Sequence, residues 1–147
     1  MREPREFEPL APNFEKALLE KAKNFQPYWK LLGMELVDVK KGWAVIRLPF
    51  DKKLTHADGI GHGGAIFSAA DTAVGMALLG LIERHETMVT IEMKFNYLKP
   101  FVAGVLLAEA RIVQKGSRTA LGEVDVTTES GECIGKGLAT YMIISKS

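Results

Sequence analysis

The reactive side chains of this 147-residue chain gather in one short segment and in the apolar run that follows it. His56, Asp58 and His62 lie within seven residues, and the apolar run contains a single carboxylate, Asp71. A carboxylate in such surroundings is unfavourable unless it finds hydrogen-bond donors or its pKa rises. Asp71 is therefore the residue most suited to general-base or nucleophilic chemistry. The alternative is a structural Asp71, held by Ser68 or by a neighbouring backbone group.

Two glycines, Gly63 and Gly64, follow His62 where the apolar run is predicted to begin a helix. Glycine there lets a ligand approach the backbone closely, and the first N–H groups of a helix have no partner inside the helix. Such a helix start can bind an anion or stabilise the oxyanion that forms during acyl transfer. The alternative is a flexible loop before the helix, in which the glycines adopt positive φ angles.

Other interpretations of the same region fail on spacing or context. Residues 59–64 match the dinucleotide-binding pattern of three glycines, but the segment before them is polar and does not read as a strand. The His and Asp side chains of residues 56–62 match no standard metal-ligand spacing, so neither a metal nor another cofactor is predicted. Ser68 lacks a nucleophile-elbow motif. A single cysteine, Cys133, excludes an intrachain disulfide and fits a reducing compartment.

Composition describes an ordinary globular domain, with 47% hydrophobic and 25% charged residues. The 19 Lys and Arg residues are balanced by 18 Asp and Glu, which does not favour nucleic acid or an anionic membrane as partner. Residues 1–6 are charged and lack the apolar core of a signal peptide. Residues 65–82 are long enough to imitate a membrane span, but Asp71 near their centre favours a buried core helix. We expect a soluble, cytoplasmic protein.

Hydrophobic periodicity predicts an α+β fold. Residues 13–32 have helical spacing, with Asn13 as N-cap and Pro27 as a bend or end, and residues 65–82 form a second, apolar helix. The other elements have a period of two, and their short connections require antiparallel pairing. The predicted strands span residues 35–39, 43–49, 89–98, 105–113, 119–127 and 133–144. A helix that is apolar on nearly every side must be wrapped by this sheet or covered by a partner subunit.

The strand over residues 89–98 carries the clearest alternation. Its odd-numbered residues from Val89 to Tyr97 are apolar or aromatic, and its even-numbered residues from Thr90 to Asn96 are polar. A regular strand therefore places Thr90 on the face opposite the helix.

Three segments, residues 62–71, 89–100 and 115–118, resemble the PaaI-like hot-dog-fold thioesterases of the 4-hydroxybenzoyl-CoA thioesterase superfamily. The resemblance implies a hot-dog fold, in which an antiparallel sheet wraps around one long apolar helix. Residues 1–32 would be an N-terminal helical extension, and residues 33–147 the hot-dog thioesterase domain. It also implies a homodimer or homotetramer whose active site is shared between subunits.

The same resemblance implies hydrolysis of an acyl-CoA thioester to a free acid and CoA. Asp71 matches the family's catalytic carboxylate, which activates water or attacks the thioester. The backbone N–H of Gly63, with His62 beside it, matches the donor that polarises the thioester carbonyl. Thr90 matches a Ser or Thr that helps to position the water.

Binding residues are also implied by the resemblance. The turn of Gly116, Ser117 and Arg118 resembles a segment that lies along the CoA moiety, where an arginine suits phosphate. Gly64 belongs to the same group of substrate-binding residues. His56 stands where many members carry Asn, and we expect it to donate a hydrogen bond to substrate or water. The alternative is a solvated loop histidine.

Two other functions compete with hydrolysis. One is a non-catalytic module that binds acyl-CoA and senses acyl chains. The other is a hot-dog dehydratase, which pairs a histidine with an acid across the subunit interface. The position of His62 before the helix favours the thioesterase over the dehydratase. The acyl group is not predicted, because the depth of an apolar pocket depends on how the subunits pack.

Overall fold

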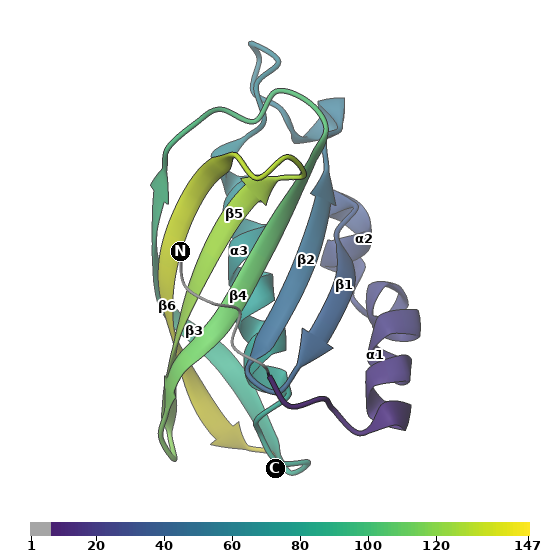
Figure 1. Ribbon diagram of the computed structural model, residues 1–147, viewed down its shortest axis with the longest axis vertical. Coiled ribbons are helices and arrows are strands. Elements are labelled where there is room, and N and C mark those ends of the chain that lie inside the picture. The colour runs from purple at the N-terminus through teal and green to yellow at the C-terminus, as the bar shows by residue number, and fades with distance from the viewer. Residues whose placement is uncertain (1–6) are drawn as a thin grey trace.

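A six-stranded antiparallel sheet curls around one long helix in the computed structural model, which describes residues 7–147 (Figure 1). The helix, α3 (Gly63–Leu79), contacts every strand, and the strands pair in the order β1-β2-β4-β5-β6-β3. Their bounds are β1 (Glu35–Lys40), β2 (Trp43–Pro49), β3 (Glu86–Tyr97), β4 (Val105–Lys115), β5 (Thr119–Thr128) and β6 (Cys133–Ser145), with a short 3-10 helix, η1 (Lys52–Leu54), after β2. The predicted α+β architecture is confirmed, and the predicted features of residues 1–6 lie outside the described residues.

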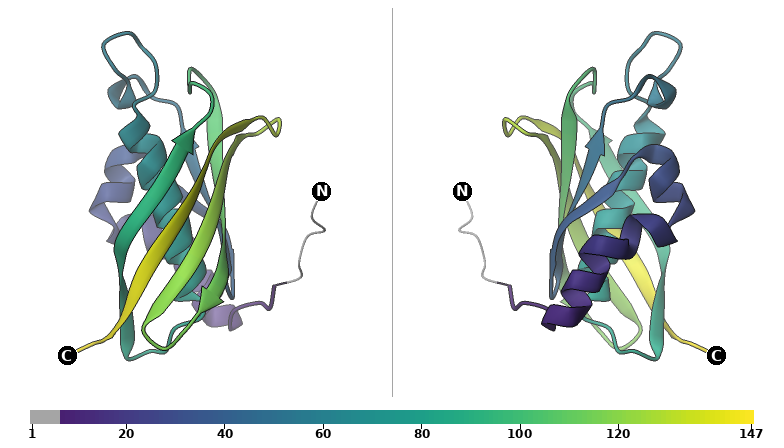
Figure 2. Two further views of the ribbon diagram at one scale, coloured as in Figure 1. Left: turned by 90° about the vertical axis from the view of Figure 1, so that its left-hand side faces the viewer. Right: turned by 90° about the vertical axis from the view of Figure 1, so that its right-hand side faces the viewer.

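The predicted helical segment of residues 13–32 is divided at Pro27, the predicted bend or end, into two helices, α1 (Pro12–Phe25) and α2 (Pro27–Leu32). Gln26 between them is extended, because a residue before proline avoids the helical region, and Pro27 then starts α2 in a position that favours proline. The prediction of Asn13 as N-cap is wrong, since it lies inside α1. Both helices lie beside α3 on the same side of the sheet (Figure 2).

The two edges of the sheet differ in what covers them. Helix α1 packs against the edge strand β1, and within residues 7–147 no strand or helix pairs with the outer edge of β3. β3 is 12 residues long, and most of its side chains are exposed, including Val89 at 47% and Ile91 at 51% of their surface. A long open edge with apolar side chains is a template for pairing with another strand.

β3 contains an irregularity that changes which side chains face α3. The pairing with β6 shifts between Thr90 and Glu92, so Ile91 is an extra residue in the strand, as in a β-bulge. Thr90 on one side of the bulge and Phe95 on the other therefore both point towards α3, where Thr90 hydrogen-bonds to Asp71. The prediction that Thr90 faces away from the helix is wrong, because it assumed unbroken alternation.

Small residues let α3 lie deep against the sheet. Gly122 of β5 lies directly under Val74, since a Cβ atom added at Gly122 would be 2.6 Å from Val74 Cγ1. The buried residues of α3 are Ala65, Ile66, Ala69, Ala70, Ala73, Val74, Gly75, Met76, Ala77 and Leu78. This packing fixes the position of the side chains at the middle of the helix. Among the described helices, none is long and apolar enough to span a membrane.

We expect Gly122→Ala to lower the free energy of unfolding by about 1–3 kcal/mol, because the added methyl group overpacks the contact with Val74. The double variant Gly122→Ala/Val74→Ala should lose less stability than the sum of the single variants, because the clashing methyl groups are gone. Urea denaturation measures all three. Gly116→Ala is a matched control, since its Cβ would meet only an ordinary contact at 3.6 Å. A loss for Gly122→Ala no larger than the control would contradict the packing argument.

Candidate active site

The start of α3 is held by His62, which is its N-cap. The backbone N–H of Gly64 donates to His62 Nδ1 at 2.8 Å, and the backbone N–H of His62 donates to the carbonyl of Leu54 at 2.6 Å. The ring of His62 stacks on that of His56, with centroids 4.5 Å apart. The predicted grouping of His56, His62 and Gly64 at the helix start is therefore present, and His62 acts there as a capping group.

Gly63 is the first residue of α3, and its N–H has no acceptor among the described residues. Its carbonyl accepts a hydrogen bond from the hydroxyl of Tyr97 at 2.8 Å. Burial raises the pKa of Tyr97, so this hydroxyl keeps its proton. A Cβ atom at Gly63 would lie 3.2 Å from the Tyr97 ring, so glycine permits the close contact. The arrangement leaves one backbone donor open for a ligand.

An apolar pocket of about 410 Å³ opens beside this helix start. Gly63 and His56 contribute to its wall, and Tyr97 and Phe101 supply aromatic surface. The remaining lining residues are Gly61, Ile66, Leu98, Lys99 and Pro100. The open N–H of Gly63 therefore borders a space that suits an apolar group.

Asp71 lies on the side of α3 that the sheet leaves partly exposed. Its Oδ1 accepts hydrogen bonds from the hydroxyl of Tyr141 at 2.6 Å and from the hydroxyl of Thr90 at 2.9 Å. No donor within residues 7–147 reaches Oδ2. The carboxylate is therefore held by one oxygen, and the other is open. The alternative partner Ser68 is excluded, because its hydroxyl bonds to the carbonyl of Gly64 and to Tyr28 instead.

Tyr141 is the site residue that the sequence analysis missed. It lies 70 residues from Asp71 and is 5% exposed. The one signal in the sequence is alternation in β6, which places Tyr141 on the same face as Ala139 and Ile143, all buried. A buried tyrosine hydroxyl needs a polar partner. That partner cannot be named until the fold is known.

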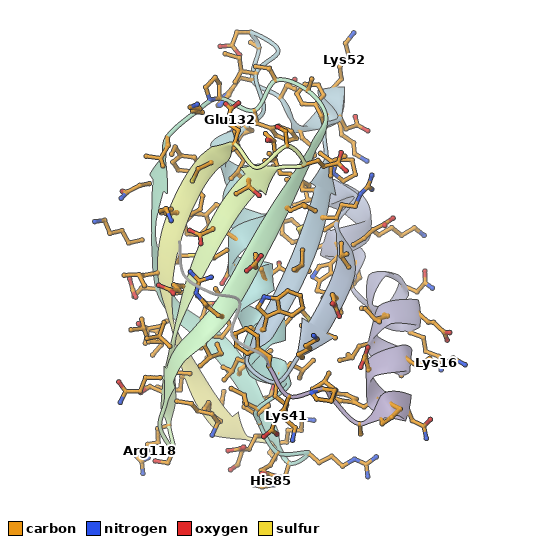
Figure 3. All side chains as sticks on the ribbon, viewed as in Figure 1. Lys16, Lys41, Lys52, His85, Arg118 and Glu132 are labelled. Atoms are coloured by element: carbon orange, nitrogen blue, oxygen red, sulfur yellow. The ribbon has the colours of Figure 1, made fainter. Side chains whose placement is uncertain are left out.

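Three of the predicted groups are not brought together within one chain. Gly63 and Asp71 lie eight residues apart on the same helix, which corresponds to about 12 Å along its axis. The Gly116–Arg118 turn lies at the opposite end of the long axis from the loop that leads into α3 (Figure 3, where Arg118 and Lys52 mark the two ends). A single chain therefore presents three separate parts of the predicted site.

A larger hollow of about 940 Å³ lies on the outer face of the sheet, away from α3. Four of its charged side chains are paired with each other: Arg111 with Glu123 and Asp125, and Lys136 with Asp125. Burial opposes ionisation of Asp125, but its bond to Lys136 and the charge of Arg111 outweigh this effect and lower the pKa of that carboxyl. Within residues 7–147, no group of three or more His, Cys, Asp or Glu side chains could hold a metal ion.

The fold is that of the hot-dog proteins, as predicted. The PaaI protein of the phenylacetic acid degradation operon of Escherichia coli has the same fold, with a TM-score of 0.78 at 20% sequence identity. The match covers 90% of this chain and 97% of PaaI. At this identity the likeness concerns the fold alone.

A family model described as the thioesterase superfamily matches residues 58–134, and the chain belongs to that superfamily. The medium/long-chain acyl-CoA thioesterase YigI of Escherichia coli is 30% identical over 132 residues, which covers 80% of this chain and 85% of YigI. SSO2140 of Saccharolobus solfataricus is 30% identical over 129 residues, which covers 88% of this chain and 91% of that protein. The chain is thus a thioester hydrolase, as the sequence predicts.

His62→Ala should remove the cap of α3 and lower the free energy of unfolding by about 0.5–2 kcal/mol. His62→Asn should restore most of this loss, because asparagine is a strong N-cap whose side-chain oxygen can accept from Gly64. Urea denaturation of both variants measures the difference. Equal losses for the two variants would show that the ring nitrogen of His62 does not cap the helix.

Proposed function

We propose that this protein hydrolyses acyl-CoA thioesters, with Asp71 as general base or nucleophile and the N–H of Gly63 as donor to the thioester carbonyl. The observation that carries the proposal is the carboxylate of Asp71, which is held at Oδ1 by two hydroxyls and has no donor at Oδ2 among the described residues, on the partly exposed side of α3. A carboxylate held in this way is pre-organised to take a proton from water or to attack a carbonyl carbon.

The reaction needs two groups on opposite sides of the thioester carbon. As a base, Asp71 takes a proton from water, whose oxygen bonds to the carbonyl carbon. The resulting oxyanion is stabilised by the N–H of Gly63, and its collapse breaks the carbon–sulfur bond. The departing CoA thiolate takes up the proton that Asp71 accepted from water, so that the products are a free acid and CoA and the carboxylate is regenerated. Thr90, bonded to Asp71 Oδ1, is well placed to orient the water.

A complete site requires two copies of the chain. A thioester oxygen lies about 3 Å from its donor, and the attacking atom lies about 3–3.5 Å from the carbonyl carbon. The separation of about 12 Å along α3 between Gly63 and Asp71 is too large for one thioester to contact both. We therefore assign the donor to the Gly63 of a second subunit.

The open edge of β3 offers a geometry that brings these groups together. Antiparallel pairing of β3 with its copy in a second subunit gives a two-fold axis, and each subunit then runs opposite to the other. The α3 helices are reversed relative to each other, so the helix start of one approaches the middle of the other. That the protein forms such a dimer, alone or within a tetramer, is a prediction. Its cytoplasmic location is also a prediction.

The remaining predicted residues fit the binding of acyl-CoA. Reversal of the subunits carries the Gly116–Arg118 turn of one chain to the end where the partner's α3 begins, so Arg118 can bind a CoA phosphate. His56 lines the apolar pocket, where it can donate to substrate or water, and Gly64 follows Gly63 in the first turn of α3. The name of YigI and the apolar lining of the pocket both support an acyl-CoA with an apolar acyl group.

We expect Asp71→Asn to lower kcat at least about 100-fold, because the amide keeps the shape of the side chain but cannot act as base or nucleophile. Release of free CoA thiol should be measured over short, long and aromatic acyl-CoA substrates. Binding of acyl-CoA to the variant, measured by calorimetry, is the control and should be retained.

Turnover of Asp71→Asn within about threefold of the parent would refute the role of Asp71, since loss of a general base costs far more. Tight binding of acyl-CoA by the parent, without thiol release from any substrate, would favour the non-catalytic binding module.

A further inference from the structure

The hydroxyl of Tyr141 contacts both the side chain and the backbone of Asp71. Its oxygen lies 2.6 Å from Asp71 Oδ1 and 2.7 Å from the Asp71 carbonyl oxygen. The backbone N–H of Gly75 and the hydroxyl of Thr90 also interact with the Tyr141 hydroxyl and partly offset the rise in its pKa. In a regular helix the N–H of Gly75 would donate to the carbonyl of Asp71, four residues earlier. The phenol of Tyr141 thus lies at the point of α3 that carries the reactive carboxylate.

Gly75 makes room for this contact. A Cβ atom at Gly75 would lie 3.1 Å from the Tyr141 hydroxyl, closer than side chains normally approach. Gly75 is buried in the interior of α3, where glycine is less favourable than alanine. The close approach of Tyr141 therefore explains the glycine at position 75, since helix propensity alone would favour alanine.

We propose that Tyr141 is a positioning residue for Asp71, which fixes Oδ1 so that Oδ2 alone faces the reacting carbon or water. The terminal torsion of an aspartate is broad, so one hydrogen bond leaves the carboxylate free to rotate. The hydroxyls of Tyr141 in β6 and Thr90 in β3 bond to the same oxygen of Asp71, Oδ1. Together they fix the plane of the carboxylate. This inference rests on the proposed role of Asp71 and extends it to a residue outside the family match over residues 58–134.

Tyr141 acts as a donor and does not exchange its proton. Burial and the negative charge of Asp71 raise the pKa of Tyr141 far above its ordinary value. The hydroxyl therefore stays protonated over any working pH. Its removal should change the rate without removing a limb of the pH–rate profile.

Tyr141→Phe keeps the ring and removes the hydroxyl, so we expect kcat to fall about tenfold or more with KM within about twofold of the parent. Gly75→Ala keeps the hydroxyl but displaces it, so kcat should fall in the same direction. Alanine favours the helix but its Cβ presses on Tyr141, so the two effects on stability oppose each other and kcat is compared per folded protein. Tyr28→Phe is the matched control: it loses a 2.7 Å hydrogen bond to Ser68, does not touch Asp71, and should leave kcat unchanged.

Asp71→Asn must be inactive in the same assay. If it is active, the proposed function of Asp71 fails, whatever Tyr141 does. If it is inactive and Tyr141→Phe has the kcat of the parent, the inference about Tyr141 alone is overturned. A kcat that falls only in proportion to the folded fraction, in both Tyr141→Phe and Gly75→Ala, also overturns it. A folded Gly75→Ala with lowered kcat supports it even where Tyr141→Phe does not fold.

Discussion

The close packing of α3 against the curved sheet is the constraint on which the rest of the structure depends. Half of the buried residues of α3 are alanine, and Gly122 of β5 lets Val74 approach the backbone. A helix held this tightly cannot slide or rotate without overpacking its neighbours. The carboxylate of Asp71 therefore meets the hydroxyls of Tyr141 and Thr90, which come from two neighbouring strands.

The same helix also separates the two groups of the proposed mechanism. The open N–H of Gly63 and the open oxygen of Asp71 lie on one rigid element, about 12 Å apart along its axis. A rigid helix cannot bring them closer, so in the proposed mechanism a second copy of the chain closes the distance. The uncovered edge of β3 provides a surface for that copy, and an antiparallel pairing there reverses the partner. In this mechanism, catalysis depends on assembly because both groups are fixed on the same rigid helix.

The sequence predicted the features that depend on local pattern. Alternation and turn residues located the strands, and the glycines after His62 located the start of α3. Three features depend on the folded backbone and could not be predicted in this way. Thr90 faces Asp71 because Ile91 is an extra residue in β3, and Tyr141 meets Asp71 across 70 residues of chain. The cap of α3 is a histidine ring, which is not among the usual capping residues.

Subunit complementation tests the shared site most directly. Gly63→Pro removes the N–H donor at the first helical position, where proline is tolerated, and Asp71→Asn removes the carboxylate. Gly63→Ala adds a Cβ beside the Tyr97 ring but keeps the N–H, so it is the control for the steric effect. Gly63→Pro and Asp71→Asn should each be inactive alone. A heterodimer of the two, purified through different tags, contains one site with both groups intact, so it should show about half the activity of the parent dimer. A heterodimer as inactive as either variant would contradict an active site assembled from Gly63 of one subunit and Asp71 of the other.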